Sequence, residues 1–186
     1  MQRKRFRYRE DKATQAAARL LKLRGGRMSH LKLIKLLYLV EREALTRLGL
    51  PLTYDAYASL PHGPVLNATL DRINSSEFYQ QGYWDRHISP KTNHTVALRD
   101  PVNVPNDQLS PAEEALIDEV FARYGHLPRW KVVDATHELP EWTDPQGSSL
   151  PIDPADILRS EGYSEEEIAE LQAQWDEVAH AQALFA

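Results

Sequence analysis

The sequence predicts a mainly α-helical protein with a small antiparallel β-sheet, an α+β fold arranged as a compact bundle around a buried central helix. Three observations lead to this prediction. Residues 30–48 are apolar at helical spacing, residues 54–60 alternate between apolar and polar side chains, and helix-start and helix-stop residues flank several other periodic segments. The 186 residues fit one domain, which buries about two-thirds of its unfolded surface.

The first two helices are separated by a glycine pair. The first is predicted from Asp11 to Arg24 and ends at Gly25 and Gly26, since glycine adopts the left-handed conformation at a helix C-terminus. Its expected apolar face consists of Ala13, Ala16, Leu20 and Leu23. Ser29 is a candidate N-cap for the second helix, His30 to Leu48. Apolar residues cover most of that helix's circumference, which predicts a central, buried position: Leu31, Leu33, Ile34, Leu36, Leu37, Leu39 and Val40.

The β-structure is predicted in two places. Residues 54–60 have the alternation of a half-buried strand, which Pro61 ends, and Pro64 is expected in the first turn of the helix that follows. Aromatic and β-branched residues then predict a small hairpin that pairs Tyr83–Ile88 with Thr95–Leu98.

Four helices are expected in the second half of the chain. Ser110, Pro111 and Glu113 combine an N-cap, a first-turn proline and a capping box, which predicts a helix to Tyr124. Further helices are predicted over residues 128–137 and 153–160, and from the cap at Ser164 and Glu167 to Ala183. The last of these has an apolar stripe formed by Ile168, Leu171, Trp175 and Val178.

The charge is unevenly distributed although the net charge is only −5. Residues 1–27 hold ten Lys or Arg against two acids, and residues 138–186 hold twelve acids against one Arg. The two ends therefore either pack together or present two differently charged surfaces to partners. We expect residues 1–145 to form one domain with a basic N-terminal segment, and residues 146–186 to form an acidic helical extension packed on it.

Composition and motifs argue against several function classes. The chain has no cysteine, which excludes disulfides and thiol nucleophiles and fits a reducing cytoplasm. No nucleophile elbow, phosphate loop or HExxH spacing is present, and a zinc site would require His62, His126 and His137 to converge. We therefore expect no catalytic residue, no cofactor and no metal. No stretch has the length of a membrane span, so a cytoplasmic protein without membrane contact is expected.

The basic N-terminal segment suggests one further ligand class. Phe6 and Tyr8 alternate with Arg and Lys over residues 3–9, a composition that could stack on nucleic-acid bases. The acidity of the whole chain argues against nucleic acid as the main ligand.

Short motifs in the first three-quarters of the chain occur in a recognisable order: Lys35-Leu36-Leu37-Tyr38, Gly49-Leu50-Pro51-Leu52, the strand at 54–60, Gly63-Pro64-Val65, Thr136-His137 and Pro140-Glu141-Trp142. Over about residues 10–145 the chain resembles the Panacea (SocA-like) domain of bacterial and phage antitoxins. The acidic tail departs from the family pattern, as does Leu60-Pro61 before the glycine.

The resemblance implies that the motif residues mainly hold the fold. Gly63 and Pro64 fix a corner, Thr136 can cap nearby carbonyls, and Trp142 can close over the core. His62 either bonds the loop backbone or faces a partner. The residues carried over from the family in this way are Lys35, Leu37, Tyr38, His62, Gly63, Pro64, Val65, Thr136, His137 and Trp142. Specificity is then expected in the region 76–108, in the basic N-terminus and in the tail.

The family members act as antitoxins that neutralise toxins encoded beside them by direct protein contact. The resemblance therefore implies an antitoxin without catalysis, whose partner is a cognate protein toxin. Two alternatives stay open: an adaptor that delivers a toxin to a protease, and a nucleic-acid-binding regulator. The sequence indicates no oligomeric state.

Overall fold

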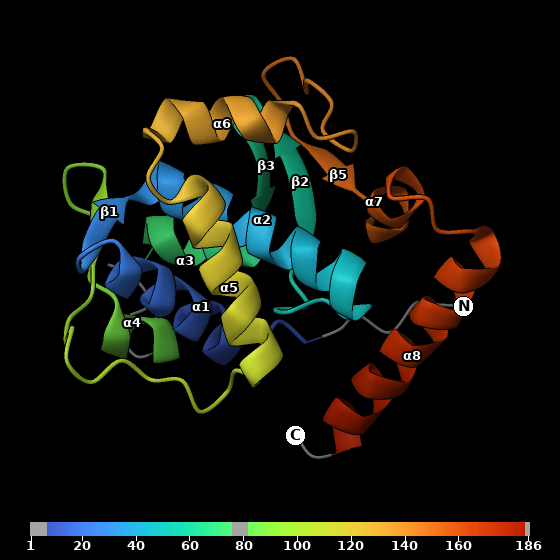
Figure 1. Ribbon diagram of the computed structural model, residues 1–186, viewed down its shortest axis with the longest axis horizontal. Helices are drawn as coiled ribbons and strands as arrows, with labels where there is room; N and C mark the ends of the chain where they lie inside the picture. The colour runs from blue at the N-terminus through green and yellow to red at the C-terminus, as the bar shows by residue number, and fades with distance from the viewer. Residues whose placement is uncertain (1–6, 76–81, 185–186) are drawn as a thin grey trace.

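The computed structural model describes residues 7–75 and 82–184 (Figure 1). The first six residues of the basic segment and residues 76–81 of the expected specificity region lie outside the described residues. Eight helices and five strands are found in the described part. The helices are α1 (Glu10–Leu23), α2 (His30–Leu48), α3 (Asn67–Ser75), α4 (Tyr83–His87), α5 (Pro111–Tyr124), α6 (Arg129–His137), α7 (Pro154–Ser160) and α8 (Glu165–Leu184), and the strands are β1 (Arg27–Ser29), β2 (Tyr57–Leu60), β3 (Gly63–Leu66), β4 (Thr95–Ala97) and β5 (Leu150–Ile152).

Helix α2 lies at the centre of the molecule, as the sequence predicts. It contacts α1, α3, α5, α6, α7, β1 and β3, and Figure 1 shows it crossing the middle of the bundle. Leu33, Leu36, Val40 and Leu45 are each 0% exposed. The α+β class and the bundle around a buried central helix are confirmed.

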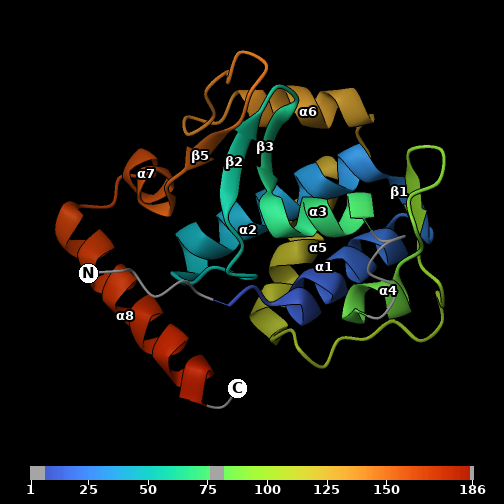
Figure 2. The same ribbon diagram turned by 180° about the vertical axis from the view of Figure 1, so that it is seen from behind.

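The strands form two small antiparallel sheets. In the larger one β2 lies between β3 and β5, with Tyr57 opposite Leu66 on one side and Ile152 on the other. Figure 2 shows β2 and β3 in front of α2, with α3 continuing from the end of β3. In the smaller sheet β1 pairs with β4, so that Met28 lies opposite Val96. Neither β1 nor β5 is predicted from the sequence.

The strand expected over residues 54–60 is shorter than predicted. It begins only at Tyr57, because Tyr54 has a positive φ of 54° and Ala56 is exposed. The half-buried alternation is also wrong, since Tyr57, Ala58 and Ser59 are all buried. As the middle strand of its sheet, β2 is paired along both edges.

Pro64 lies in a strand and not, as expected, in the first turn of a helix. Helix α3 begins at Asn67, and its first amide groups bind a side chain from an earlier segment. The carboxylate of Asp55 accepts hydrogen bonds from the backbone N–H of Ala68 at 2.8 Å and of Thr69 at 2.9 Å. This cap comes from a tertiary contact, which a local start signal cannot indicate.

The predicted hairpin of Tyr83–Ile88 with Thr95–Leu98 is wrong. Residues 83–87 form α4, and only one isolated bridge joins Ile88 to Leu98. Helix α4 packs on α1, where Trp84 is 0% exposed and its backbone N–H donates to Glu10 Oε1 at 2.9 Å. Burial of one large aromatic side chain against a helix thus overrides the local strand propensity.

Two of the three serine N-caps predicted from the sequence are confirmed. Ser110 and Glu113 form the predicted capping box, and so do Ser164 and Glu167. Ser29 makes no capping bond, and its hydroxyl has no hydrogen-bond partner. One detail of the prediction is wrong at the end of α1, where Leu23 is 43% exposed; the helix ends at Leu23 with Arg24 as its C-cap, close to the predicted end.

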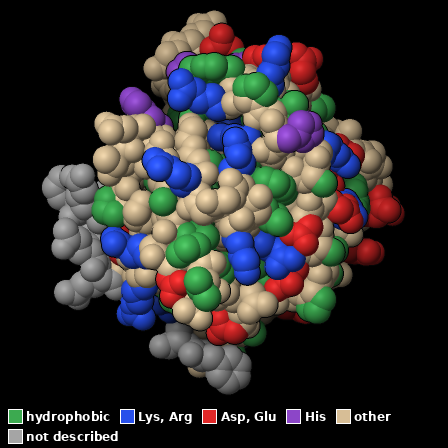
Figure 3. Space-filling model, turned by 60° about the vertical axis from the view of Figure 1, so that its left-hand side comes forward, with side chains coloured by type: hydrophobic (Ala, Val, Ile, Leu, Met, Phe, Trp, Pro, Cys, Tyr) green, Lys and Arg blue, Asp and Glu red, His purple; other side chains and the backbone are tan. Residues whose placement is uncertain are grey.

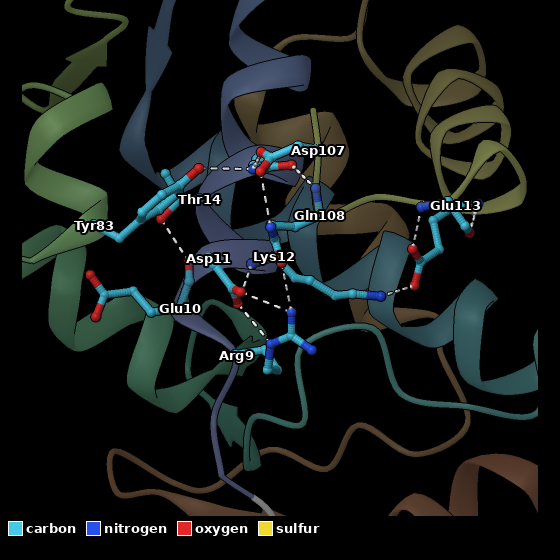
Figure 4. A network of polar contacts seen from close by, with 11 residues as sticks. Arg9, Glu10, Asp11, Lys12, Thr14, Tyr83, Asp107, Gln108 and Glu113 are labelled. Carbon is cyan, nitrogen blue, oxygen red and sulfur yellow. Dashed lines mark hydrogen bonds and ion pairs between the residues drawn. The ribbon is translucent and has the colours of Figure 1, made fainter. Parts of the chain in front are cut away.

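The described part of the basic N-terminal segment pairs with nearby acids and with α5 (Figure 4). Arg9 binds Asp11 at 2.8 Å, Lys12 binds Glu113 at 2.5 Å, and Arg19 reaches two more acids of α5. Among residues 7–75 and 82–184, no ion pair joins this segment to the acidic tail. Of the two sequence-based alternatives, mutual packing of the charged ends is therefore not seen in the described part.

The acidic tail packs at the C-terminal end of α2. Helix α8 extends along one side of the molecule (Figure 1). The Trp175 indole N–H donates to the Gly49 carbonyl at 2.7 Å, and the Tyr163 hydroxyl donates to the Thr46 carbonyl at 2.6 Å. No described helix has the length and apolar character needed to cross a membrane.

Candidate functional site

The motif residues of the sequence converge where α2, the β2–β3 hairpin, α6 and the segment after α6 meet. We call this group the signature cluster: Lys35, Tyr38, Gly63, Pro64, Thr136, His137, Glu141 and Trp142. Leu37 and Val65 are 1% and 2% exposed and belong to the apolar core beside it. His62 is exposed, and its ring makes a T-shaped contact with the Trp130 ring, with the two ring centroids 5.7 Å apart.

Gly63 is a point of close approach between the hairpin and α6. Its φ is +95°, a conformation that L side chains rarely adopt. A Cβ atom there would lie 2.6 Å from Thr136 Oγ1 and 3.3 Å from Lys35 Nζ. The Thr136 hydroxyl donates to the Val133 carbonyl at 2.8 Å, so its position is fixed. Only glycine fits this contact without a shift of α6.

Lys35 brings a buried amine to the same corner. Its side chain is almost fully buried, and Nζ donates to the Pro64 carbonyl at 2.8 Å. Within the described residues no carboxylate forms an ion pair with it. Burial lowers the pKa of Lys35 from 10.5 to about 7. The amine therefore links α2 to β3 as a hydrogen-bond donor in a site with little solvent.

Glu141 forms a buried ion pair with α2. Its side chain is 0% exposed, and Oε1 accepts from Arg42 Nε and from the Tyr38 hydroxyl, each at 2.9 Å. Burial and the charge of Glu141 raise the pKa of Tyr38. Arg42 also binds Glu161 at 2.7 Å, which connects the start of the tail to the same centre. Neither Glu141 nor Arg42 is among the site residues predicted from the sequence; the acid between proline and tryptophan in the closing motif was the available signal.

The rings of His137 and Trp142 close the cluster on the other side. They stack with their centroids 4.1 Å apart, and the Trp142 indole N–H donates to the Leu60 carbonyl at 3.1 Å. His137 Nε2 is buried without a hydrogen-bond partner. His126 is exposed, and the described residues contain no group of three or more His, Asp or Glu side chains arranged to hold a metal ion.

A second buried acid, Glu41 of α2, binds the strand side. Glu41 Oε2 accepts from the Thr53 backbone N–H at 3.0 Å, and Oε1 accepts from the Tyr57 hydroxyl at 3.0 Å. Burial raises the pKa of Glu41 to about 7. Glu41 is not among the residues predicted from the sequence, because the alternation around Tyr57 indicated a half-buried strand.

The arrangement joins segments rather than presenting groups to solvent. Lys35, Tyr38 and Glu141 are buried, and each bonds to a different part of the chain. The structural role expected for the motif residues stays a prediction, which the variants Gly63→Ala and Lys35→Met test.

The same region matches a known family. The family model described as "Antitoxin SocA-like, Panacea domain" matches residues 33–143. This span begins in α2, ends just after Trp142 and contains every residue of the signature cluster. Comparison with curated proteins and with solved structures gives no match.

The first prediction concerns the close approach at Gly63. We expect Gly63→Ala to lower the free energy of unfolding by about 3 kcal/mol, because the new Cβ adds a clash with Thr136 to the backbone strain. Gly162→Ala is the matched control: its φ is +90° but nothing lies within 4 Å. It should cost about 1 kcal/mol. Equal losses in denaturant titrations would show that the contact with Thr136 is unimportant.

The second prediction concerns the amine of Lys35. Between about pH 7 and pH 10 the unfolded chain binds a proton on Lys35 that the folded protein releases, so this residue makes stability rise with pH. Lys35→Met should abolish that rise, a slope of up to about 1.4 kcal/mol per pH unit. Chemical denaturation of both proteins across this range measures it. If the free energies of unfolding of the wild type and of Lys35→Met changed in parallel with pH, Lys35 would stay charged in the folded protein.

Proposed function

Because this chain belongs to the SocA-like antitoxin family defined by the Panacea domain, we propose that it neutralises a protein toxin by binding directly to it. The family match covers more than half of the chain. The toxin would be the product of a neighbouring gene, as the family resemblance implies. We propose no catalytic step.

The observation that carries this proposal is the position of the family residues. Lys35, Tyr38 and Glu141 are buried, with Lys35 bonded to Pro64 and Tyr38 bonded to Glu141, so they are not available to a partner. Such a cluster supports a scaffold whose outer surface does the binding. Different surfaces on one interior would then allow related antitoxins to bind unrelated toxins.

The absence of exposed reactive chemistry in this cluster supports a role without catalysis. Its ionisable groups are the buried lysine that donates to a carbonyl, the carboxylate paired with Arg42, the Tyr38 hydroxyl bonded to that carboxylate, and His137 stacked on Trp142. We place the action in the cytoplasm, since a protein without cysteine fits a reducing compartment.

We further propose that the tail belongs to the same structural unit. Residues 1–145 would form the antitoxin domain, with residues 146–186 as its extension. The Arg42–Glu161 ion pair and the Trp175–Gly49 hydrogen bond both join the tail to α2 or to its end. Strand β5 also extends the sheet beside β2.

Co-expression tests the proposed function. The neighbouring gene product should arrest growth when expressed alone, and growth should recover when this protein is expressed with it. The two proteins should also co-purify, because the proposed mechanism is direct contact. A toxin that stays lethal despite folded antitoxin would contradict the proposal.

Toxin abundance separates inhibition from delivery to a protease. A direct inhibitor should leave the toxin level unchanged or higher after synthesis is stopped. Faster loss of the toxin in the presence of this protein would instead identify an adaptor.

A further inference from the structure

Three stretches of the sequence contain no Asp or Glu: residues 22–40, 86–99 and 120–133. The fold brings them together on one side of the molecule. Strand β1 of the first stretch pairs with β4 of the second. Lys32 of the first donates to the carbonyls of Gly125 and Leu127 in the third, both at 2.6 Å. Segments far apart in the sequence thus combine into one surface without carboxylates of their own.

Exposed basic side chains populate this surface, which we call the basic face: Lys22, Arg24, Arg27, Arg86, Arg99 and Arg129. None of them forms an ion pair with a carboxylate in residues 7–75 and 82–184. Figure 3 shows Lys and Arg side chains spread over the middle of this side, with Asp and Glu mainly toward its margins.

The charges on the basic face are close enough to influence one another. Burial lowers the pKa of His30, and the charges of Lys91, His94 and Arg129 lower it further against an opposing hydrogen bond. Burial likewise lowers the pKa of Lys32, with an added contribution from Arg24. Like charges held together in this way repel, and an anionic partner would remove that repulsion.

Most arginines outside the basic face form ion pairs with carboxylates. Six arginines outside the three stretches pair with acids in the described residues: Arg9, Arg19, Arg42, Arg47, Arg72 and Arg159. Within the third stretch, Arg123 pairs with Glu43 and Lys131 with Asp134, so neither counts among the residues of the basic face. The chain as a whole carries a net charge of −5. Acids are therefore plentiful, and their absence from the basic face leaves a localised positive surface on an acidic protein.

Two exposed apolar side chains indicate a protein partner. Leu23 lies between Lys22 and Arg24 and is 43% exposed, and Trp130 is 49% exposed with the Arg129 guanidinium 5.4 Å from its ring centre. Tryptophan and arginine are enriched among residues that dominate protein–protein binding energy. The net negative charge of the whole chain disfavours a polyanion such as DNA. We propose that the basic face docks an acidic surface of the toxin, which rests on the proposed function.

The test compares two charge reversals of equal size. Arg24→Glu with Arg27→Glu changes the basic face, whereas Arg47→Glu with Arg159→Glu changes exposed arginines of α2 and α7. Binding of the purified neighbouring-gene toxin is measured by calorimetry at low and at high salt, with circular dichroism to confirm folding. The first pair should weaken binding at low salt by at least about tenfold, and the second pair by less than about threefold.

Each outcome has a separate meaning. A wild-type protein that does not bind the toxin contradicts the proposed function itself. A toxin bound equally well by the wild type and by the Arg24→Glu/Arg27→Glu variant contradicts only the assignment of the basic face. Loss of affinity for a short DNA duplex, with toxin binding unchanged in that variant, would reassign the face to nucleic acid and overturn the proposal.

Discussion

The structure depends on one constraint: the central helix is buried on all sides over most of its length, from Lys32 to Arg42, yet it carries charged and polar groups there. Each such group loses hydration on folding and needs a partner inside the protein. The partners come from different segments. Lys32 bonds to the α5–α6 turn, Lys35 to β3, Glu41 to residues 53 and 57, and Arg42 to Glu141 after α6. Because each pairing has a directional geometry, these bonds fix the register of the surrounding elements more closely than apolar packing alone.

This constraint separates the interior from the surface in functional terms. The residues that identify the family serve the central helix and its neighbours, so they can recur wherever the scaffold recurs. The surface is free of that requirement and can carry partner-specific features. The basic face is such a feature, since exposed residues like Arg24 and Arg27 pair with no acid in the described part of the chain, whereas Arg42 is held by Glu141 and Glu161.

The sequence predicted the features whose causes are local. The buried central helix followed from its apolar circumference, and the capping box at Ser110 followed from three neighbouring residues. Features with distant causes were missed or misassigned. Asp55 caps a helix that begins twelve residues later, and Trp84 turns an expected strand into a helix by packing on α1. Gly63 was singled out for its backbone freedom, but the reason that no Cβ fits there lies at Thr136.

The buried carboxylate of Glu141 offers the most direct test of this account. Glu141→Ala leaves Arg42 without its buried partner, so the free energy of unfolding should fall by about 3–5 kcal/mol. Glu161→Ala removes the other acid bound to Arg42, whose side chain is 42% exposed, and should cost less than about 1 kcal/mol. Denaturant unfolding of the two variants beside the wild type gives both values. Similar small losses for both would contradict the claim that the buried polar contacts of the central helix hold the fold together.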